Sequence, residues 1–93
     1  MDNNEKYSDT FIKKKITTFI INKFLLGDSS SSPSDDESFL ERGIIDSTGV
    51  LELVNFIEET FSITVEDEEL VPDNLDSLNK LTSYIIKKIG HVS

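Results

Sequence analysis

Hydrophobic side chains recur along this chain at the spacing of three or four residues that places them on one side of an α-helix. Three such stripes predict an N-terminal, a middle and a C-terminal helix. The stripes are Ile12, Ile16, Phe19, Ile20 and, at the edge, Phe24; then Val50, Leu53, Val54, Ile57 and Phe61; then Leu78, Leu81, Ile85 and Ile89. Alternation typical of a β-strand does not extend beyond residues 61–65, so the pattern predicts an all-α protein.

Residues that commonly begin or end helices flank these stripes. The expected caps are Ser8 or Asp9 before the first helix, Gly27 after it, and Asp76 or Ser77 before the last helix. Between the middle and last helices, residues 66–70 can form one turn, which we expect Pro72 to stop. The prediction is a small four-helix bundle with three longer helices and one short third helix.

The length of 93 residues allows a single domain, residues 1–93. Residues 1–8 are polar and predict a flexible N-terminus, while residues 27–38 are rich in Ser and Asp and predict a flexible loop. No segment approaches the roughly 20 apolar residues of a membrane-spanning helix, and no secretory signal is recognisable. We therefore expect a cytoplasmic protein without membrane insertion.

Charge is distributed unevenly along the chain, whose formal net charge is −9. Residues 24–79 contain fifteen acidic side chains and one basic one, Arg42, whereas the two ends hold eight Lys and three acids. This balance excludes ordinary nucleic-acid binding, which needs clustered Lys and Arg against phosphates. Two interpretations remain, namely a solvated surface that keeps the protein soluble and a docking surface for basic partners.

Most catalytic and metal chemistry is excluded by the residues that the chain lacks. Without Cys there can be no disulfide, thiolate metal site or protein thiol nucleophile. The single histidine, His91, lies near the C-terminus and is a poor candidate for a catalytic triad. The acidic run of residues 66–76 lacks the spacing of a calcium loop. We expect neither an enzyme nor a metal site.

One candidate site remains, in residues 43–49 (GIIDSTG), just before the middle helix. Asp46 or Ser47 could serve only as the N-cap of that helix. A phosphodiester on Ser47 would, however, face unsatisfied backbone N–H groups and the positive end of the helix dipole. The polar side of the same helix contains Glu52, Glu58 and Glu59, with Leu51 among them. An apolar residue on an acidic face is typical either of a tolerated surface leucine or of a protein-docking face.

Residues 39–89 resemble the acyl carrier proteins and the related aryl and peptidyl carrier domains. The resemblance rests on the Asp46-Ser47 pair, on residues 50–54 (VLELV), on Glu58, Glu59 and Phe61, and on residues 74–78 (NLDSL) before the last helix. Fatty-acid and polyketide carriers usually have Leu after the serine, whereas this chain has Thr48 followed by Gly49. The DSTG form is similar to stand-alone carriers of specialised pathways or cell-envelope modification.

The resemblance implies that Ser47, with Asp46 beside it, is the attachment site of 4′-phosphopantetheine, transferred from coenzyme A by a phosphopantetheinyl transferase. The arm would hold an acyl or aminoacyl group as a thioester. The other implied partners are a loading enzyme and a downstream synthase or transferase. Basic partner surfaces would be guided by Asp46, Glu52, Glu58 and Glu59, and apolar contact would come from Thr48 and Leu51. We expect a monomer. The alternative is an unmodified acidic adaptor that uses the same helix only to bind a partner protein.

Overall fold

The computed structural model describes residues 8–90, so the predictions for residues 1–7 and for His91 lie outside the described range. Five α-helices and two short 3-10 helices follow one another: α1 (Asp9–Phe24), η2 (Ser29–Ser31), α2 (Phe39–Arg42), α3 (Ser47–Phe61), η3 (Asp67–Glu69), α4 (Pro72–Leu75) and α5 (Leu78–Gly90). Residues 8–90 contain no strand. The prediction of an all-α bundle with three long helices is confirmed.

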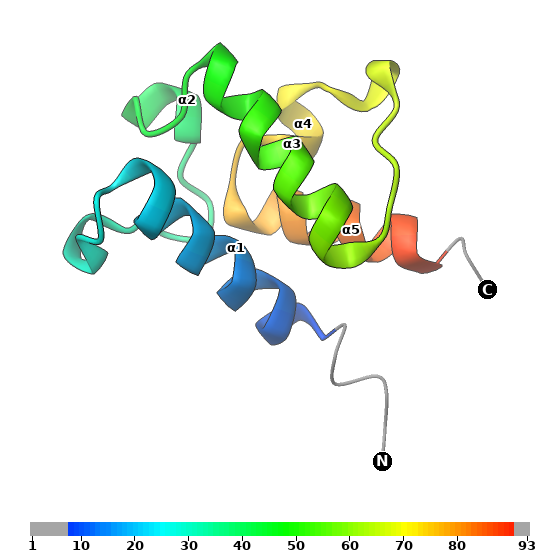
Figure 1. Ribbon diagram of the computed structural model, residues 1–93, viewed down its shortest axis with the longest axis horizontal. Helices are drawn as coiled ribbons and strands as arrows, with labels where there is room; N and C mark the ends of the chain where they lie inside the picture. Colours follow the sequence, from blue (N-terminus) through cyan, green and yellow to red (C-terminus); the bar gives the residue numbers. More distant parts are fainter. Residues whose placement is uncertain (1–7, 91–93) are drawn as a thin grey trace.

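The three long helices enclose the core. Figure 1 shows α1 and α3 running antiparallel, while α5 crosses behind them and packs against α1, α3 and α4. The stripes predicted from the sequence face inward, and their fully buried members include Ile12, Ile16, Ile20, Leu53, Ile57, Leu81 and Ile85. Phe19 and Ile89 are only partly buried at the margin of the core. Helices of this length are marginal alone in water, so the shared core is what stabilises them.

Serine hydroxyls cap the first and last helices. Ser8 Oγ accepts a hydrogen bond from the N–H of Phe11 at 3.1 Å, and Ser77 Oγ accepts one from the N–H of Lys80 at 3.1 Å. Of the two cap candidates at each end, the serine is therefore the cap. Beyond α1 the chain turns sharply at Gly27, whose φ of +84° is the left-handed conformation that glycine adopts without steric cost.

The short turn predicted between the middle and last helices is present, but a second short helix, α4, follows it. Residues 66–70 do form one turn, η3, but Pro72 begins a helix instead of stopping one. Proline is well suited to the first position of a helix, because its fixed φ is already helical and the N–H that it lacks would have no partner there. The expectation that Pro72 stops the third helix was wrong for this reason.

Helix α2 has only four residues and was not predicted as a separate element. Ser38 caps it. Asp76, which lies much later in the sequence, also binds its first turn. The N–H of Leu40 donates to Asp76 Oδ1 at 3.0 Å, the N–H of Phe39 donates to the carbonyl of Asp76 at 3.1 Å, and the Ser38 hydroxyl donates to Asp76 Oδ2. A single helical turn is not stable alone, so α2 depends on its contact with Asp76 at the end of α4.

The Ser- and Asp-rich segment 27–38 contains η2, whose N-cap is Asp28. Its far end is attached to two long helices. Lys13 Nζ of α1 lies 3.0 Å from Asp35 Oδ2, and the N–H of Asn79 in α5 donates to the carbonyl of Asp35 at 2.9 Å. Pro33 is buried. The segment is thus anchored to the bundle at Asp35, and its flexibility stays a prediction.

Candidate functional site

Ser47 is the first residue of α3, and its side chain is exposed. The preceding Asp46 is the N-cap, because its Oδ1 accepts the N–H of Gly49 at 2.7 Å. Its carbonyl also accepts the N–H of Val50 at 3.0 Å. Among residues 8–90 the Ser47 hydroxyl has no hydrogen-bond partner. Asp46 caps the start of α3, so the Ser47 hydroxyl is not used for capping.

The first turn of α3 also presents unpaired backbone donors. A helix begins with N–H groups that have no intrahelical acceptor, and Asp46 satisfies the one on Gly49. The N–H groups of Ser47 and Thr48 have no acceptor within the described residues. Together with the positive end of the helix dipole, they make the surroundings of Ser47 favourable for a negatively charged group.

Gly49 allows the end of α1 to pack against this first turn. A Cβ at Gly49 would lie 2.9 Å from Cε1 of Phe24 and 3.1 Å from Cγ2 of Ile45, both too close. The Phe24 ring therefore lies directly over the backbone two residues beyond Ser47. The glycine of the DSTG motif therefore has a packing reason.

A cavity of about 310 Å³ opens beside Ser47. Its wall is almost entirely apolar and comes from α2, α3, α4 and the segment before α4. The lining residues are Phe39, Leu40, Ile45, Ser47, Val50, Leu51, Leu53, Leu70, Val71, Pro72, Leu75 and Asp76. Leu40, Leu51 and Val71 also belong to the exposed apolar residues, at 45%, 57% and 39% exposure. The cavity has an apolar interior and an apolar rim that solvent can reach.

The segment that carries Leu70 and Val71 is fixed by a polar cluster around Glu69. Glu69 Oε1 accepts hydrogen bonds from the N–H of Glu66 at 2.9 Å, from Lys88 Nζ at 2.9 Å and from the Tyr84 hydroxyl at 2.8 Å. These donors, the Glu66 N–H first, lower the pKa of Glu69 to about 2. Burial, followed by the bond to Glu69, raises the pKa of Tyr84. The cluster joins this wall of the cavity to α5.

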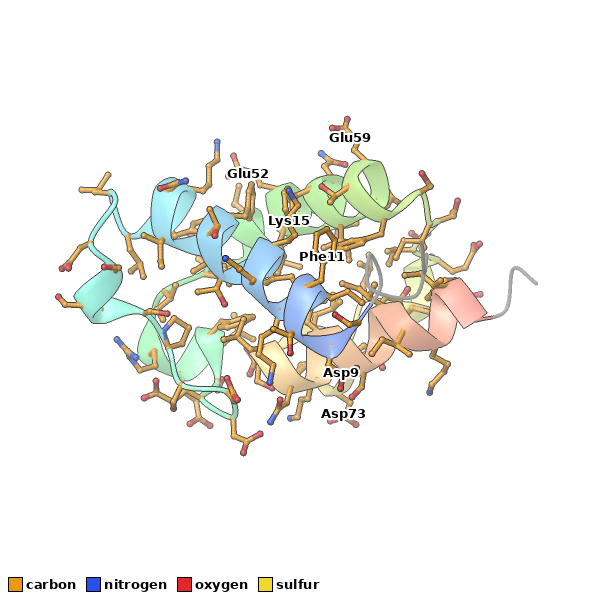
Figure 2. The ribbon with its side chains drawn as sticks, turned by 90° about the horizontal axis from the view of Figure 1, so that it is seen from below. Asp9, Phe11, Lys15, Glu52, Glu59 and Asp73 are labelled. Carbon is orange, nitrogen blue, oxygen red and sulfur yellow. The ribbon has the colours of Figure 1, made fainter. Side chains whose placement is uncertain are left out.

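The structure separates the predicted docking residues into groups. Each residue of an α-helix turns by about 100°, so Leu51 lies about 40° from Ser47 around α3, whereas Glu52 and Glu59 lie about 120–140° away. Figure 2 shows Glu52 and Glu59 on the same side of α3. Glu52 Oε1 lies 3.7 Å from Lys23 Nζ of α1. Leu51 and Ser47 meet at the cavity, and the two glutamates form a separate acidic edge.

Glu58 has a structural contact that the sequence pattern did not indicate. It is partly buried, and its Oε2 accepts the N–H of Val65 at 2.9 Å. This bond supports the chain after α3. Thr48 and Glu59 are exposed. The cavity residues Leu40 and Val71 were not among the predicted site residues, although the apolar pair at residues 70–71, outside any helical stripe, was a possible signal.

Other kinds of site are absent from the described part of the chain. Residues 8–90 hold no group of three or more His, Asp or Glu side chains placed to bind a metal ion. Over the same residues, no helix combines the length and the apolar character needed to cross a membrane. The exposed serine at the start of α3 and the neighbouring apolar cavity are the arrangement of a carrier domain.

Comparison with known proteins leads to the same class. The chain is 36% identical over 83 residues to an acyl carrier protein of Akkermansia muciniphila, which covers 89% of this chain and 99% of the relative. It is 35% identical over 52 residues to a D-alanyl carrier protein of Streptococcus suis, or 56% of this chain and 66% of the relative. The crystal structure of an acyl carrier protein from Thermotoga maritima matches with a TM-score of 0.71 and 26% identity, over 91% of this chain and 94% of that one. No family model matches the chain.

The chain belongs to the acyl carrier protein family. The identity and coverage shared with the Akkermansia muciniphila protein, and the fold shared with the Thermotoga maritima structure, support this conclusion independently. Proteins of this family are carriers and not enzymes, so the prediction that the chain is not an enzyme is confirmed through its relatives.

Proposed function

We propose that this protein carries an acyl group as a thioester on a 4′-phosphopantetheine arm attached to Ser47. The observation that carries the proposal is the division of roles at the start of α3. Asp46 caps the helix, and the Ser47 hydroxyl is exposed, without a protein partner among the described residues, and next to an apolar cavity. A serine needed only as a cap would not have this geometry.

The residues around Ser47 fit the proposed group. The unpaired N–H groups of Ser47 and Thr48, at the positive end of the α3 dipole, favour a phosphodiester on the neighbouring hydroxyl. When attached, the arm supplies a thiol, which a chain without Cys lacks. No side chain has to move to expose Ser47, because the cap bond belongs to Asp46.

The apolar cavity supports an acyl cargo. Ten of its twelve lining residues are apolar, and Asp76, one of the two polar ones, already accepts bonds from Ser38 and Leu40. An acyl chain can be buried there without leaving a polar group unpaired. The similarity to D-alanyl carrier proteins keeps an aminoacyl cargo as the second candidate.

The proposed partners act on or through the Ser47 arm. They are a phosphopantetheinyl transferase, a loading enzyme and a downstream synthase or transferase. Leu51 and Thr48 would give apolar contact beside the arm, while Glu52 and Glu59, with Glu58 and Asp46, would attract basic partner surfaces. The Thr48-Gly49 pair supports a role in a specialised pathway. The cytoplasmic location and the monomeric state stay predictions.

Intact-mass measurement after incubation with a phosphopantetheinyl transferase and coenzyme A tests the proposal. We expect the wild-type chain to gain one phosphopantetheine group and Ser47→Ala to gain none. Ser29→Ala, which removes an exposed hydroxyl in η2, is the matched control and should be modified like the wild type. Because Asp46 keeps the cap, Ser47→Ala should change the free energy of unfolding by no more than about 0.5 kcal/mol.

Two outcomes would contradict the proposal. A mass gain in Ser47→Ala would place the attachment elsewhere. A wild-type chain that is never modified, but still binds its partner through α3, would support the alternative of an unmodified acidic adaptor.

A further inference from the structure

A second hollow lies between α1 and α3 and shares no lining residue with the cavity at Ser47. It has a volume of about 710 Å³, and three partly buried phenylalanines, Phe11, Phe19 and Phe56, line it. The rings of Phe19 and Phe56 are stacked, with centroids 4.1 Å apart and planes inclined by 12°. Figure 2 shows Phe11 on α1, on the side next to α3. We call this hollow the α1/α3 groove.

The charges that line the groove are opposite in sign to the charge of the molecule. In a chain of net charge −9, the charged lining residues are Lys14, Lys15 and Lys23. Lys23 lies 3.7 Å from Glu52, but Lys14 and Lys15 have no ion-pair partner within the described residues. Lys15 Nζ instead lies 5.8 Å from the centroid of the Phe11 ring.

The shape of the groove indicates the kind of partner. A surface that inserts into a lipid bilayer presents protruding apolar side chains, whereas these rings are partly buried in a hollow. A hollow of this kind accepts side chains that protrude from another helix. The unpaired lysines lie on α1, and neither Glu52 nor Glu59 of α3 lines the groove. Negative charge is therefore favoured along the α1 side.

We propose that the α1/α3 groove binds an acidic amphipathic helix of a partner protein. Apolar side chains of that helix would rest on Phe11, Phe19 and Phe56, and its carboxylates would face Lys14 and Lys15. Phe56 lies nine positions after Ser47, which places the two residues about 180° apart around α3. A partner in the groove thus leaves Ser47 accessible to a second protein. The proposal goes beyond carrier function and does not depend on modification of Ser47.

The experiment is a titration of the isotope-labelled full chain, followed by the NMR shifts of its amides. The probe is a synthetic helical peptide of Glu, Ala and Leu, about 16 residues long, with Leu on one side of the helix. We expect saturable shifts confined to α1 and to the neighbourhood of Phe56. The charge reversal Lys14→Glu with Lys15→Glu should weaken binding by at least roughly fivefold. Phe11→Ala should weaken it without changing the net charge.

A matched control separates the groove from the overall charge. Lys80→Glu with Lys87→Glu makes the same change in net charge at two exposed lysines of α5 outside the groove, and it should change affinity by less than about twofold. Equal weakening by both pairs, or the absence of localised shifts, would overturn the proposal.

Shifts that grow with protein concentration in the absence of peptide would assign the groove to a second copy of this chain. Shifts at the groove with phosphatidylglycerol vesicles but not with the peptide would assign it to a membrane surface. Either result overturns the proposal.

Discussion

Gly49 shows how packing overrides helix propensity at a single position. Alanine is favoured over glycine inside a helix by about 1 kcal/mol, so propensity alone argues against this residue in α3. The Phe24 ring explains it, because its Cε1 would lie only 2.9 Å from a Cβ at position 49. That ring also packs edge-on against Phe19, with centroids 5.9 Å apart, which restricts its movement. The close approach of α1 to the start of α3 thus leaves no room for a side chain at position 49 unless the Phe24 ring shifts.

We therefore expect Gly49→Ala to destabilise the protein by about 1–3 kcal/mol, as overpacking of a tight contact does. Urea unfolding followed by circular dichroism measures the change. Adding Phe24→Leu should recover part of the loss by making room for the new methyl group. Gly90→Ala, where a Cβ would meet nothing within 4 Å, is the control and should be close to neutral. A Gly49→Ala variant at least as stable as the wild type would show that the ring moves aside freely.

At the scale of elements, the cluster around Glu69 joins η3 to α5 and fixes a wall of the cavity. One carboxylate oxygen accepts three donors, from Glu66, Tyr84 and Lys88. The side chains of Glu69 and Lys88 are 30% and 21% exposed, so solvent screens this pair only partly. The ionised form of Glu69 is favoured in the folded protein, and its pKa is lowered from 4.5 to about 2.

This lowered pKa predicts the pH dependence of the cluster. A carboxylate whose pKa is lower in the folded state stabilises the fold above its unfolded pKa, and this contribution is lost as the pH falls from about 4.5 towards about 2. Glu69→Gln should therefore be less stable than the wild type near neutral pH, and the difference should shrink across that window. Urea unfolding at several pH values measures it.

Glu68→Gln is the control for the pH experiment, because Glu68 is exposed and its side chain makes no hydrogen bond within the described residues. The difference in the free energy of unfolding between Glu68→Gln and the wild type should not shrink between about pH 4.5 and about pH 2. A constant difference between Glu69→Gln and the wild type down to about pH 2 would contradict the role assigned to the ionised carboxylate.

The elements also show what the sequence could and could not predict. The three long helices were predictable because the apolar spacing of each is contained within its own residues. Helix α2 is too short for such a pattern and is held by Asp76, which lies 36 positions beyond Leu40. Pro72 is compatible both with stopping a helix and with beginning one, and only the neighbouring fold decides between them.

The candidate site follows the same division between local and distant contacts. The Asp46-Ser47 step at a helix start is a local signal, and the structure confirms that the helix begins there. The cavity beside it was not predictable in detail, because its walls come from α2, α3 and residues 70–76, which only the tertiary fold brings together. The bond from Val65 to Glu58 likewise depends on the tertiary fold, because Val65 lies in the chain after α3 has ended at Phe61.

At the scale of the whole molecule, most of the acidic charge lies between the ends of the chain, and part of it forms the acidic edge of α3 that holds Glu52 and Glu59. Exposed charges are screened beyond about 8 Å at physiological salt, so they act mainly on the rate at which partners meet. Glu52 and Glu59 are exposed and lie on one edge (Figure 2). The pair between Glu52 and Lys23 is about half exposed on both sides, so its loss should cost little stability.

We expect Glu52→Lys with Glu59→Lys to slow modification of Ser47 by a transferase several-fold, with little change in melting temperature. Modification of the wild type should also slow as salt is added. The matched control is Glu68→Lys with Asp73→Lys, which makes the same change in net charge at exposed acids outside α3. The rate of mass gain measures both pairs. Equal slowing by the two pairs of substitutions would show that only the net charge matters. A modification rate that does not change with salt would show that the acidic edge is only a solvated surface.

The attachment of α2 to Asp76 also determines the order in which the protein can assemble during synthesis. A ribosome releases the chain from its N-terminus, so Ser38 emerges 38 residues before the carboxylate that accepts its hydroxyl. The residues of α3, with Ser47 at its start, likewise emerge before those of α4 and α5, against which the core of the bundle is completed. The wall of the cavity formed by α2 and residues 70–76 can be completed only after Asp76 has been synthesised. Ser47 therefore leaves the ribosome before the residues that complete the cavity beside it.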